Sequence, residues 1–412
     1  MTMARLDGMA QIAQPDKALR RVVDCVAAAL QPAAPIETQI VGVPALEDFL
    51  ELWRGLQRRA VESNIFLSPD LLLPALRRLG SGDEKIILAL RSDGEAGRRL
   101  VGLMPVGLAR GRHGPLPAPA TVWRHPFSMI GAPLIDREDA GKVLTALLER
   151  ADEAGLPGAM LMPYLRHDGP VFAALSEISL YSGRPLVVIE EFERATIATE
   201  MDSERYLGTT IGSGRRRRLK RHRRRLEEIG PVTFECHERA SEVVPAFEEF
   251  LALEAAGWKG DRGTAIACEP AVQTFFTEVV ARLSARQSAR IYALRLSGKA
   301  IAMMLVVTSG REAHAWKMAF DQTYAQHSPG VLMMVEAMAH MIDDGRIARV
   351  DSLTDPGHAM VESLWCERQG FANAVIGIGR GRARFELAVA LEGLRMRAKR
   401  AVSDLRQLRK GR

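Results

Sequence analysis

Cysteine is scarce in this chain of 412 residues, and its pattern excludes two kinds of structure. The four cysteines, Cys25, Cys236, Cys268 and Cys366, lie far apart and form no C-x-x-C pair. Neither a disulfide framework nor a zinc site is therefore indicated. The histidines show no H-E-x-x-H or similar spacing, so we expect no metal cofactor.

Long apolar runs are also missing from the sequence. No stretch is apolar for long enough to cross a bilayer. The first 35 residues hold only a short apolar run, interrupted by Asp24, and lack the layout of a signal peptide. We therefore expect a cytoplasmic protein, with a peripheral position at the inner membrane face as the alternative.

Acidic residues are few in two segments of the chain. Residues 214–228 hold nine Lys or Arg against two Glu, and residues 395–412 hold eight against one Asp. Since the net charge is +6, these two segments, at +7 each, leave −8 for the rest. This distribution favours localised anion binding. We expect an Arg-rich helix at 215–228 whose partner is a membrane surface, a phosphorylated acceptor, the acidic body of the chain itself or, as the less favoured alternative, RNA.

The periodicity of apolar residues predicts strands and helices in a repeated order. Expected strands lie at 85–91, 99–109, 121–124, 158–164, 185–195, 231–237, 290–296, 299–307, 312–320, 347–353 and 371–377. Expected helices lie at 45–61, 69–79, 137–154, 169–180, 241–256, 269–285, 328–345 and 359–369. We interpret this as a mixed α/β chain with a lead-in at 1–35, two similar units at 36–200 and 201–380, and a basic helical tail at 381–412.

The strand expected at 312–320 alternates with period two. Its first face, which we expect in the core, holds His314, Trp316, Met318 and Phe320. Its second face, small enough for a ligand to lie against, holds Ala313, Ala315, Lys317 and Ala319. On that face Lys317 either meets a phosphate or is solvated at a strand edge.

The start of the following helix is typical of an anion site. Ser328 is a good N-cap, Pro329 suits the first helical position, and Gly330 places no side chain beside the exposed N–H groups. The first turn carries no acid, so it can accept a phosphate from outside the chain. The alternative is an ordinary capped helix. In the first unit the corresponding helix begins among three acids that would repel a pyrophosphate, which are Asp136, Glu138 and Asp139.

Four segments occur in an order that is typical of one family. They are the Arg-rich helix ending in LEEIG, GWKGDRGTA at 257–265, a W-K-x-x-x-D plus SPG segment at 316–330, and DSLTDPGHAMVESLW at 351–365. In this order they resemble the CelD-like acetyltransferases of the GNAT superfamily, which are associated with cellulose biosynthesis and related to the Fem aminoacyltransferases. The resemblance covers about 205–380 and, more weakly, the first half.

The resemblance implies two tandem, duplicated GNAT-like folds, the first degenerate and the second cofactor-binding. Acetyl-CoA or another acyl-CoA would lie along a splayed central strand, with its pyrophosphate at the next helix N-terminus. The family's R/Q-x-x-G-x-G/A cradle falls near Gln326, Gly330 and Leu332, with fewer glycines here. We therefore expect cofactor binding by Lys317, Gln326, His327, Ser328, Pro329, Gly330 and Val331.

Acyl transfer needs a base that takes a proton from the incoming amine or hydroxyl. Asp351, at the end of a predicted strand, and His358, in the adjoining loop, are the catalytic candidates. The alternative is a turn residue and a surface histidine. Trp258 and Lys259 either form the floor of an acceptor pocket or only end a helix. Asp321 either contacts the substrate or caps a turn.

Together these features predict an acyl-CoA-dependent N- or O-acyltransferase. It would move an acetyl or other acyl group to an amine or hydroxyl acceptor, in polysaccharide or envelope biosynthesis as the family association implies. One alternative is a Fem-like transferase that uses aminoacyl-tRNA, with the basic helix on RNA phosphates. The other is a non-catalytic accessory protein of a polysaccharide synthase.

Overall fold

One thirteen-stranded mixed sheet runs through the computed structural model, which describes residues 34–410 except 93, 95–96, 111, 113–117 and 380–381. The lead-in expected at 1–35 lies almost wholly outside the described residues. The strands of the first half are β1 (Ile36–Val41), β2 (Lys85–Ser92), β3 (Arg98–Leu108), β4 (Ala120–Val122), β5 (Leu134–Ile135), β6 (Ala159–Arg166) and β7 (Leu186–Ile197). Those of the second half are β8 (Val232–His237), β9 (Ala289–Leu296), β10 (Lys299–Ser309), β11 (Glu312–Phe320), β12 (Arg349–Asp351) and β13 (Glu367–Gly377).

The strand order contains the same pattern twice. It reads β1-β2-β3-β4-β6-β13-β7-β12-β11-β10-β9-β8, with β5 paired to β3 off this path. From either end, three antiparallel pairings are followed by one parallel pairing, β4 with β6 and β11 with β12. An antiparallel pairing comes next on each side, β6 with β13 and β12 with β7. The two patterns are thus related by a pseudo-twofold axis between the antiparallel strands β7 and β13.

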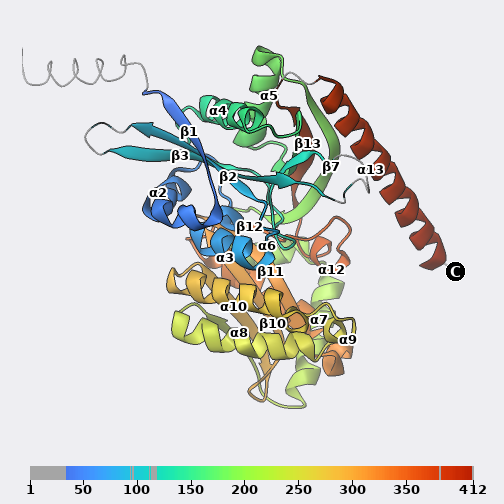
Figure 1. Ribbon diagram of the computed structural model, residues 1–412. Coiled ribbons are helices and arrows are strands. Elements are labelled where there is room, and N and C mark those ends of the chain that lie inside the picture. The colour runs from blue at the N-terminus through green and yellow to red at the C-terminus, as the bar shows by residue number, and fades with distance from the viewer. Residues whose placement is uncertain are drawn as a thin grey trace, which may run out of the picture.

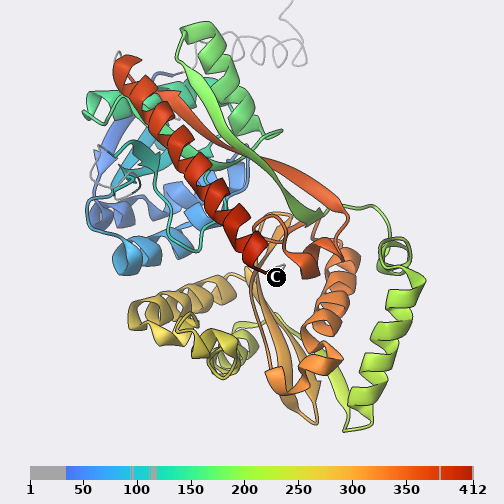
Figure 2. The ribbon, with the colours of Figure 1, turned by 90° about the vertical axis from the view of Figure 1, so that its right-hand side faces the viewer.

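Each half completes its part of the sheet with a strand from the other. β13, which the expected boundaries assign to the second unit, pairs with β6 and β7 of the first, and β7 pairs with β12 of the second. Figure 2 shows these two long strands side by side where the halves meet. The halves are therefore repeats in sequence order but share one sheet.

Helices cover both faces of the sheet (Figure 1). Those of the first half are η1 (Val43–Phe49), α2 (Leu50–Arg59), η2 (Ile65–Leu67), α3 (Pro69–Leu79), α4 (Ala140–Glu153) and α5 (Pro170–Ser182). Those of the second are α8 (Ala240–Ala255), α9 (Trp258–Asp261), η4 (Ile266–Cys268), α10 (Pro270–Ala285), η5 (Gln322–His327), α11 (Pro329–Asp343) and α12 (Ala359–Glu362). Between and after them lie α6 (Ser203–Thr210), the Arg-rich α7 (Ser213–Glu227) and α13 (Arg382–Lys410). Among the helices described, none combines the length and apolar character that crossing a bilayer requires.

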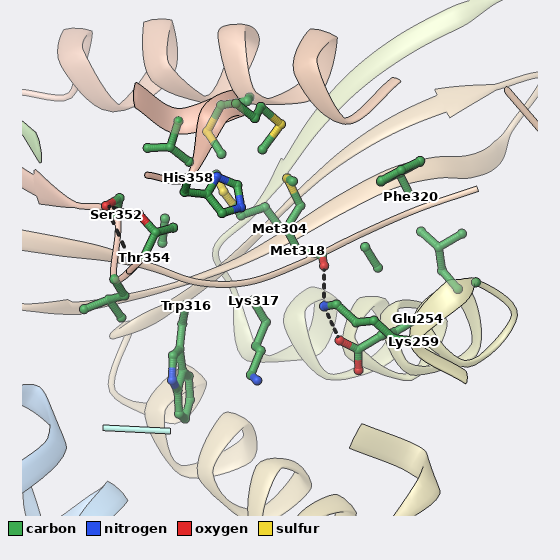
Figure 3. Close-up of a pocket in the computed structure, with 18 of the residues that line it drawn as sticks. Glu254, Lys259, Met304, Trp316, Lys317, Met318, Phe320, Ser352, Thr354 and His358 are labelled. Carbon is green, nitrogen blue, oxygen red and sulfur yellow. Dashed lines mark hydrogen bonds and ion pairs between the residues drawn. The ribbon is translucent and has the colours of Figure 1, made fainter. Parts of the chain in front are cut away.

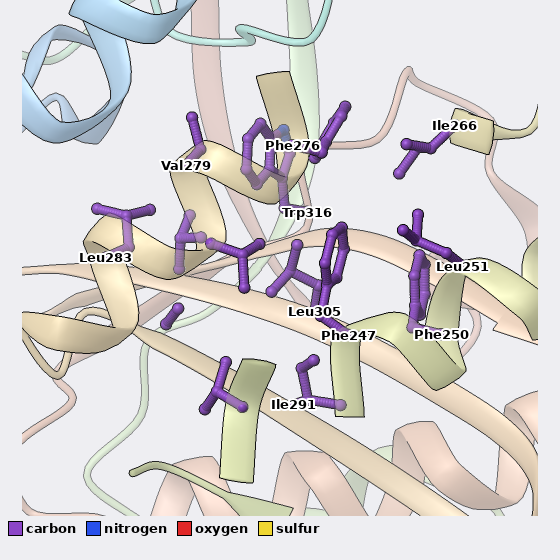
Figure 4. Packing of buried hydrophobic residues seen from close by; sticks show 14 of the residues in the cluster. Phe247, Phe250, Leu251, Ile266, Phe276, Val279, Leu283, Ile291, Leu305 and Trp316 are labelled. Atoms are coloured by element: carbon purple, nitrogen blue, oxygen red, sulfur yellow. The ribbon is translucent and has the colours of Figure 1, made fainter. Parts of the chain in front are cut away.

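Two apolar clusters lie on opposite faces of the second half of the sheet. On one face Phe247 of α8 and Phe276 of α10 pack over Leu305 of β10 (Figure 4). Phe66 of the first half belongs to the same cluster and is buried. On the other face α11 contributes Met333 to a second cluster. Because burying one such side chain stabilises by about 1.5–3 kcal/mol, the shared cluster holds the halves together.

The helix expected at 359–369 is shorter than the sequence pattern predicts. α12 ends at Glu362, and β13 begins at Glu367. Leu364 and Trp365 between them are fully buried, so the chain turns inward instead of continuing as a surface helix. This turn leads the chain from the second half into the sheet of the first.

Candidate active site

Strands β11 and β12 diverge near the middle of the sheet. They pair in parallel only where Glu312–His314 meet Arg349–Asp351. β12 ends at Asp351, whereas β11 continues to Phe320. The backbone edge of β11 beyond His314 therefore has no strand partner on the β12 side.

A pocket of about 390 Å³ opens at this divergence (Figure 3). β11 lines it with Ala315–Phe320, and the segment after β12 lines it with Ser352–Thr354. Most of the remaining wall is apolar, from Leu253, Trp258, Met304, Met334, Met360, Val361 and Trp365. Four titratable side chains reach the pocket, which are Glu254, Lys259, Lys317 and His358.

A β-bulge at Trp316 decides which side chains of β11 lie on which face. Leu305 of β10 pairs with Lys317 and Val306 pairs with Ala315, so Trp316 is inserted between them. Trp316 packs on the α8 and α10 face, whereas Met318 packs on the α11 face. The alternation expected for this strand is therefore wrong, because a period of two does not include the inserted residue.

Lys317 lies on the face of α10 and not on that of α11. Its Nζ atom is 4.4 Å from the ring centroid of Phe127 and 5.3 Å from that of Phe276. Lys317 and His358 extend to opposite sides of the strand (Figure 3). Desolvation and the charge of Lys259 lower the pKa of Lys317 to about 8. Lys317, expected either to meet a phosphate or to be solvated at a strand edge, thus points away from the start of α11.

Lys259 is held by a buried acid that the sequence argument missed. Its Nζ atom lies 2.7 Å from Glu254 Oε1 and donates a 2.8 Å hydrogen bond to the Met318 carbonyl on β11. Glu254 is almost fully buried and also accepts from Ile266 N at 2.8 Å. An acid inside the apolar run FLALEAAG was the available signal, since buried acids need partners. Neighbouring Trp258 is 41% exposed at the pocket rim.

The first turn of α11 lies beside the Phe320 end of the pocket. A Cβ atom built on Gly330 would be 3.5 Å from Phe320 Cδ1 and 3.7 Å from Met318 Cε. The first turn carries no acid, and the side chain of Ser328 makes no capping hydrogen bond. Ser328 has a φ of 52°, the left-handed conformation that L-residues rarely adopt.

The segment before α11 is a short 3-10 helix and not a glycine-rich loop. Within η5 the N–H of Tyr324 donates to Asp321 O, and that of Ser328 donates to Ala325 O. Asp321 accepts from Thr323 N at 2.9 Å and lies 3.2 Å from Lys299 Nζ. Asp321 thus caps a turn and is not among the residues that line the pocket. His327 is also outside the lining, because it faces α7 with its ring 6.3 Å from that of His222.

The other residues expected near a phosphate have different surroundings. Gln326 is exposed, whereas Val331 is half-buried against the α11 cluster. Pro329 is buried at the first helical position. The structure places Gly330 of this segment against Phe320 and Met318, which line the pocket.

The two catalytic candidates lie in different environments. His358 is exposed, caps α12 and lines the pocket. Asp351 is buried, with Oδ2 2.9 Å from Arg194 Nη1 and Oδ1 accepting from Leu353 N at 2.9 Å. The structure brings His358 together with Trp258 and Lys259, but not with Asp351.

The first half repeats the helix start, but α4 begins at Ala140, so Asp136, Glu138 and Asp139 precede the helix and its first turn carries no acid. Asp139, before α4, has a φ of 57°, like Ser328 before α11. It lies 3.1 Å from Arg91, and Asp136 lies 2.8 Å from Arg59. The acids expected to keep a pyrophosphate out of this position are therefore paired within the fold. Among the described residues, no group of three or more His, Cys, Asp or Glu side chains is placed to hold a metal ion.

A shared sheet with two pseudo-symmetric halves, diverging parallel strands and a following helix defines a tandem GNAT fold. Residues 213–359, just over a third of the chain, match the family model of the acetyltransferase (GNAT) domain. The match includes α7, the divergence of β11 and β12, and the start of α11. The predicted fold, tandem GNAT-like units in a mixed α/β chain, is confirmed.

Three solved structures are similar to this one at low sequence identity. The crystal structure of FemX is 11% identical, covers 86% of this chain and 100% of its own, and has a TM-score of 0.52. A tandem GNAT protein from the clavulanic acid biosynthesis pathway is 13% identical over 84% of this chain and 99% of its own, with a TM-score of 0.41. L-PGS from Bacillus licheniformis is 13% identical over 83% of this chain and 96% of its own, with a TM-score of 0.47. No curated protein sequence matches the chain.

Proposed function

We propose that this protein is a GNAT-type acyltransferase that transfers an acetyl or other acyl group from acyl-CoA to an amine or hydroxyl. The observation that carries the proposal is the pocket at the divergence of β11 and β12, beside an acid-free helix N-terminus. The family match spans both features. The second half, from 201 to 380, supplies this site, and we regard it as the acyltransferase unit.

The residues around the pocket suit an acyl-CoA. The unpaired edge of β11 beyond His314 offers backbone N–H and C=O groups to an amide-containing chain such as pantetheine. The start of α11, with Gly330 against the pocket wall, offers the positive end of a helix dipole to a pyrophosphate. The apolar wall, which includes Met304 and Trp365, excludes water. When bound, the acyl-CoA supplies an activated thioester carbonyl.

We assign the proton transfer to His358, because it lines the pocket and an imidazole nitrogen can accept a proton from the acceptor. It would take a proton from the acceptor amine or hydroxyl at an imidazole nitrogen. Lys259 holds the Met318 carbonyl of β11 and so fixes the strand beside the pocket. Asp351, the second candidate base, has both carboxylate oxygens engaged in this structure.

For the acceptor we propose a chemical class. The resemblance to CelD-like acetyltransferases favours a sugar-containing amine or hydroxyl in polysaccharide or envelope biosynthesis. A cytoplasmic protein that binds the inner membrane face through α7 fits such an acceptor. The Fem-like alternative uses aminoacyl-tRNA, and the accessory alternative binds neither substrate.

A thermal-shift comparison of acetyl-CoA, a long-chain acyl-CoA and tRNA tests the function. A ligand that binds the folded state raises the melting temperature by mass action, so acetyl-CoA should raise it in a concentration-dependent way. A shift with tRNA but with neither acyl-CoA would support the Fem-like alternative. No shift with any of the three would overturn the enzymatic proposal and favour an accessory protein.

A further inference from the structure

We propose that the acceptor carries an anionic group, a carboxylate or a phosphate, and that Lys317 binds this group on the face of the sheet opposite α11. The inference rests on the proposed acyl transfer, because it names the class of acceptor for the same pocket. Four observations on the described residues carry it, and each concerns the surroundings of Lys317.

The first observation is the charge balance of the pocket. Of the four titratable side chains in its wall, Glu254 and Lys259 neutralise each other at 2.7 Å. Glu254 uses its second oxygen on the N–H of Ile266, so no free carboxylate remains in the wall. Lys317 forms no ion pair with a described acid, and its charge is left without a partner inside the pocket.

The second observation is the surroundings of the Lys317 ammonium. The rings of Phe127 and Phe276 lie 4.4 and 5.3 Å from Nζ, which satisfies part of the charge but offers no hydrogen-bond acceptor. Desolvation at this position is costly for an ammonium. A ligand anion that reaches such a desolvated cation forms a charge-assisted hydrogen bond that is stronger than at the surface.

The third observation is the separation of Lys317 from the proposed donor site. The bulge at Trp316 turns Lys317 toward α10, whereas Gly330 and the start of α11 lie against Met318 and Phe320 on the other face. The phosphates of an acyl-CoA at α11 therefore do not occupy the space beside Lys317. The anion bound there comes from the acceptor.

The fourth observation is that a loop of the first half of the chain lies against the Lys317 ammonium. Trp316 Nε1 donates a 3.0 Å hydrogen bond to the carbonyl of Phe127, which fixes the loop after β4 over β11. Phe127 also packs against Phe276 with ring centroids 4.9 Å apart. The first half thus supplies one of the two rings next to the Lys317 ammonium, and α10 of the second half supplies the other.

A matched set of acceptors tests the inference. Glucosamine, glucosamine 6-phosphate and muramic acid are all amino sugars. The first has no anionic group, the second has a phosphate and the third has a carboxylate. CoA release from acetyl-CoA would be followed for the native protein, for Lys317→Met, and for Lys299→Met, whose lysine is exposed and pairs with Asp321. We expect Lys317→Met to lower kcat/KM for at least one anionic acceptor by about 10- to 100-fold, the loss of one charged hydrogen bond.

The same variant should lower kcat/KM for that anionic acceptor more than kcat/KM for glucosamine and should not weaken acetyl-CoA binding, whereas Lys299→Met should not change the ratio of the two kcat/KM values. The acid that responds, phosphate or carboxylate, identifies the anionic group. An equal effect on all three sugars, or none on either anionic sugar, would show that Lys317 does not select an anion. A loss of acetyl-CoA affinity would assign Lys317 to the donor and overturn the inference while supporting the proposed function.

A second measurement does not depend on turnover. The rate at which Lys317 is reductively methylated at pH 8 can be followed by mass spectrometry, with Lys299 as the internal reference. Glucosamine 6-phosphate or muramic acid should protect Lys317, and glucosamine should not. Equal labelling with all three sugars contradicts the inference. If the anionic sugars protect but acetyl-CoA fails to bind in calorimetry, the anion site stands and the acyl-transfer proposal fails.

Discussion

Arg194 of β7 and Asp351 of β12 form a buried ion pair where the two halves of the sheet meet. Arg194 Nη1 lies 2.9 Å from Asp351 Oδ2, and both side chains are almost completely buried. The guanidinium lies 4.1 Å from the ring centroid of Phe371 on β13 and donates to the carbonyl of Met129 at 3.1 Å. One arginine therefore connects both exchanged strands to the strand end beside the candidate active site.

Because Asp351 is in this buried pair and His358 is not, an experiment can distinguish these two catalytic candidates. Replacing Asp351 by Asn leaves the Arg194 charge buried without its partner, which should lower the free energy of unfolding by about 3 kcal/mol or more. Replacing His358 by Gln should leave stability nearly unchanged, because His358 is exposed, but lower kcat by about 100-fold. Urea unfolding and CoA-release kinetics with the acceptor set measure these effects.

The matched variant Arg194→Met with Asp351→Asn removes both charges of the pair. If Asp351 serves only the fold, the double variant should recover much of the stability lost in Asp351→Asn, together with its activity. A double variant that is stable but inactive would make Asp351 the base. Wild-type turnover in His358→Gln would remove His358 from the mechanism.

Local patterns in the sequence predicted the elements that carry the site. The alternation near Trp316 predicted a strand, and the Ser328–Pro329–Gly330 sequence predicted a helix start. Both patterns depend on neighbouring residues only. The bulge at Trp316 was not predictable, since it depends on the pairing of β11 with β10. The orientation of Lys317 follows from that bulge and was missed for the same reason.

Contacts between distant segments were equally beyond the sequence patterns. The exchange of β7 and β13 between the halves rests on pairings between residues more than 150 positions apart. No local signal tells that Arg194 will meet Asp351 or that Glu254 will hold Lys259. The family resemblance supplied the tandem fold, but not these partners.

Charge at the start of α11 should decide whether acyl-CoA binds. At Gly330 a Cβ atom meets only ordinary contacts with Phe320 and Met318, so the backbone tolerates a side chain. Gly330→Glu adds a carboxylate to a first turn that has none and should repel a pyrophosphate. We expect at least about a tenfold loss of acetyl-CoA affinity by calorimetry, on the scale of one helix-terminal charge in a partly buried site.

Gly330→Gln is the matched control, because it has nearly the same size without the charge. It should lose much less affinity than Gly330→Glu, with equal melting temperatures for the two. Equal losses in both variants would mean that the side chain acts by steric block. Unchanged affinity in Gly330→Glu would place the cofactor elsewhere.

Glu62 gives the protein a pH-dependent stability. Burial raises its pKa to about 7, and the nearby Arg166, with Nε 3.7 Å from Oε1, opposes this only in part. Between pH 4.5 and 7 the folded protein holds a proton that the unfolded chain has lost, so the free energy of unfolding falls as pH rises through this range. Glu62→Gln removes this term, which is about 3 kcal/mol.

The test is urea unfolding of native protein and Glu62→Gln at pH 5 and pH 8. The variant should gain stability relative to the native protein on going from pH 5 to pH 8. Glu51→Gln, at an exposed position, should follow the native protein at both values. A constant difference between native protein and Glu62→Gln at the two pH values contradicts the prediction.

The Arg-rich helix α7 divides into a paired and an unpaired set of cations. Arg223 pairs with Glu227 and Glu336, and Arg224 lies 3.5 Å from Glu228. Arg215 is half-buried and donates to the carbonyl of Ser363 at 2.6 Å. The other six cations form no ion pair with a described acid and are exposed, namely Arg216, Arg217, Arg218, Lys220, Arg221 and Arg225. The acidic body thus neutralises only part of the helix, and the outward set is available to an anionic membrane surface.

Replacing Arg216, Arg217, Lys220 and Arg221 by Gln should therefore weaken binding to phosphatidylglycerol-containing vesicles by at least tenfold, since each cation near such a surface contributes about 1 kcal/mol. The melting temperature should stay the same or rise slightly, because Arg217 and Arg221 are four residues apart and repel each other. Arg223→Gln, the control, should instead lower the melting temperature and leave vesicle binding nearly intact.

Vesicle sedimentation at low and high salt measures the binding, which should weaken with salt. Loss of tRNA binding without loss of vesicle binding would support the RNA alternative, and a fall in melting temperature with unchanged vesicle binding would make α7 a purely structural helix.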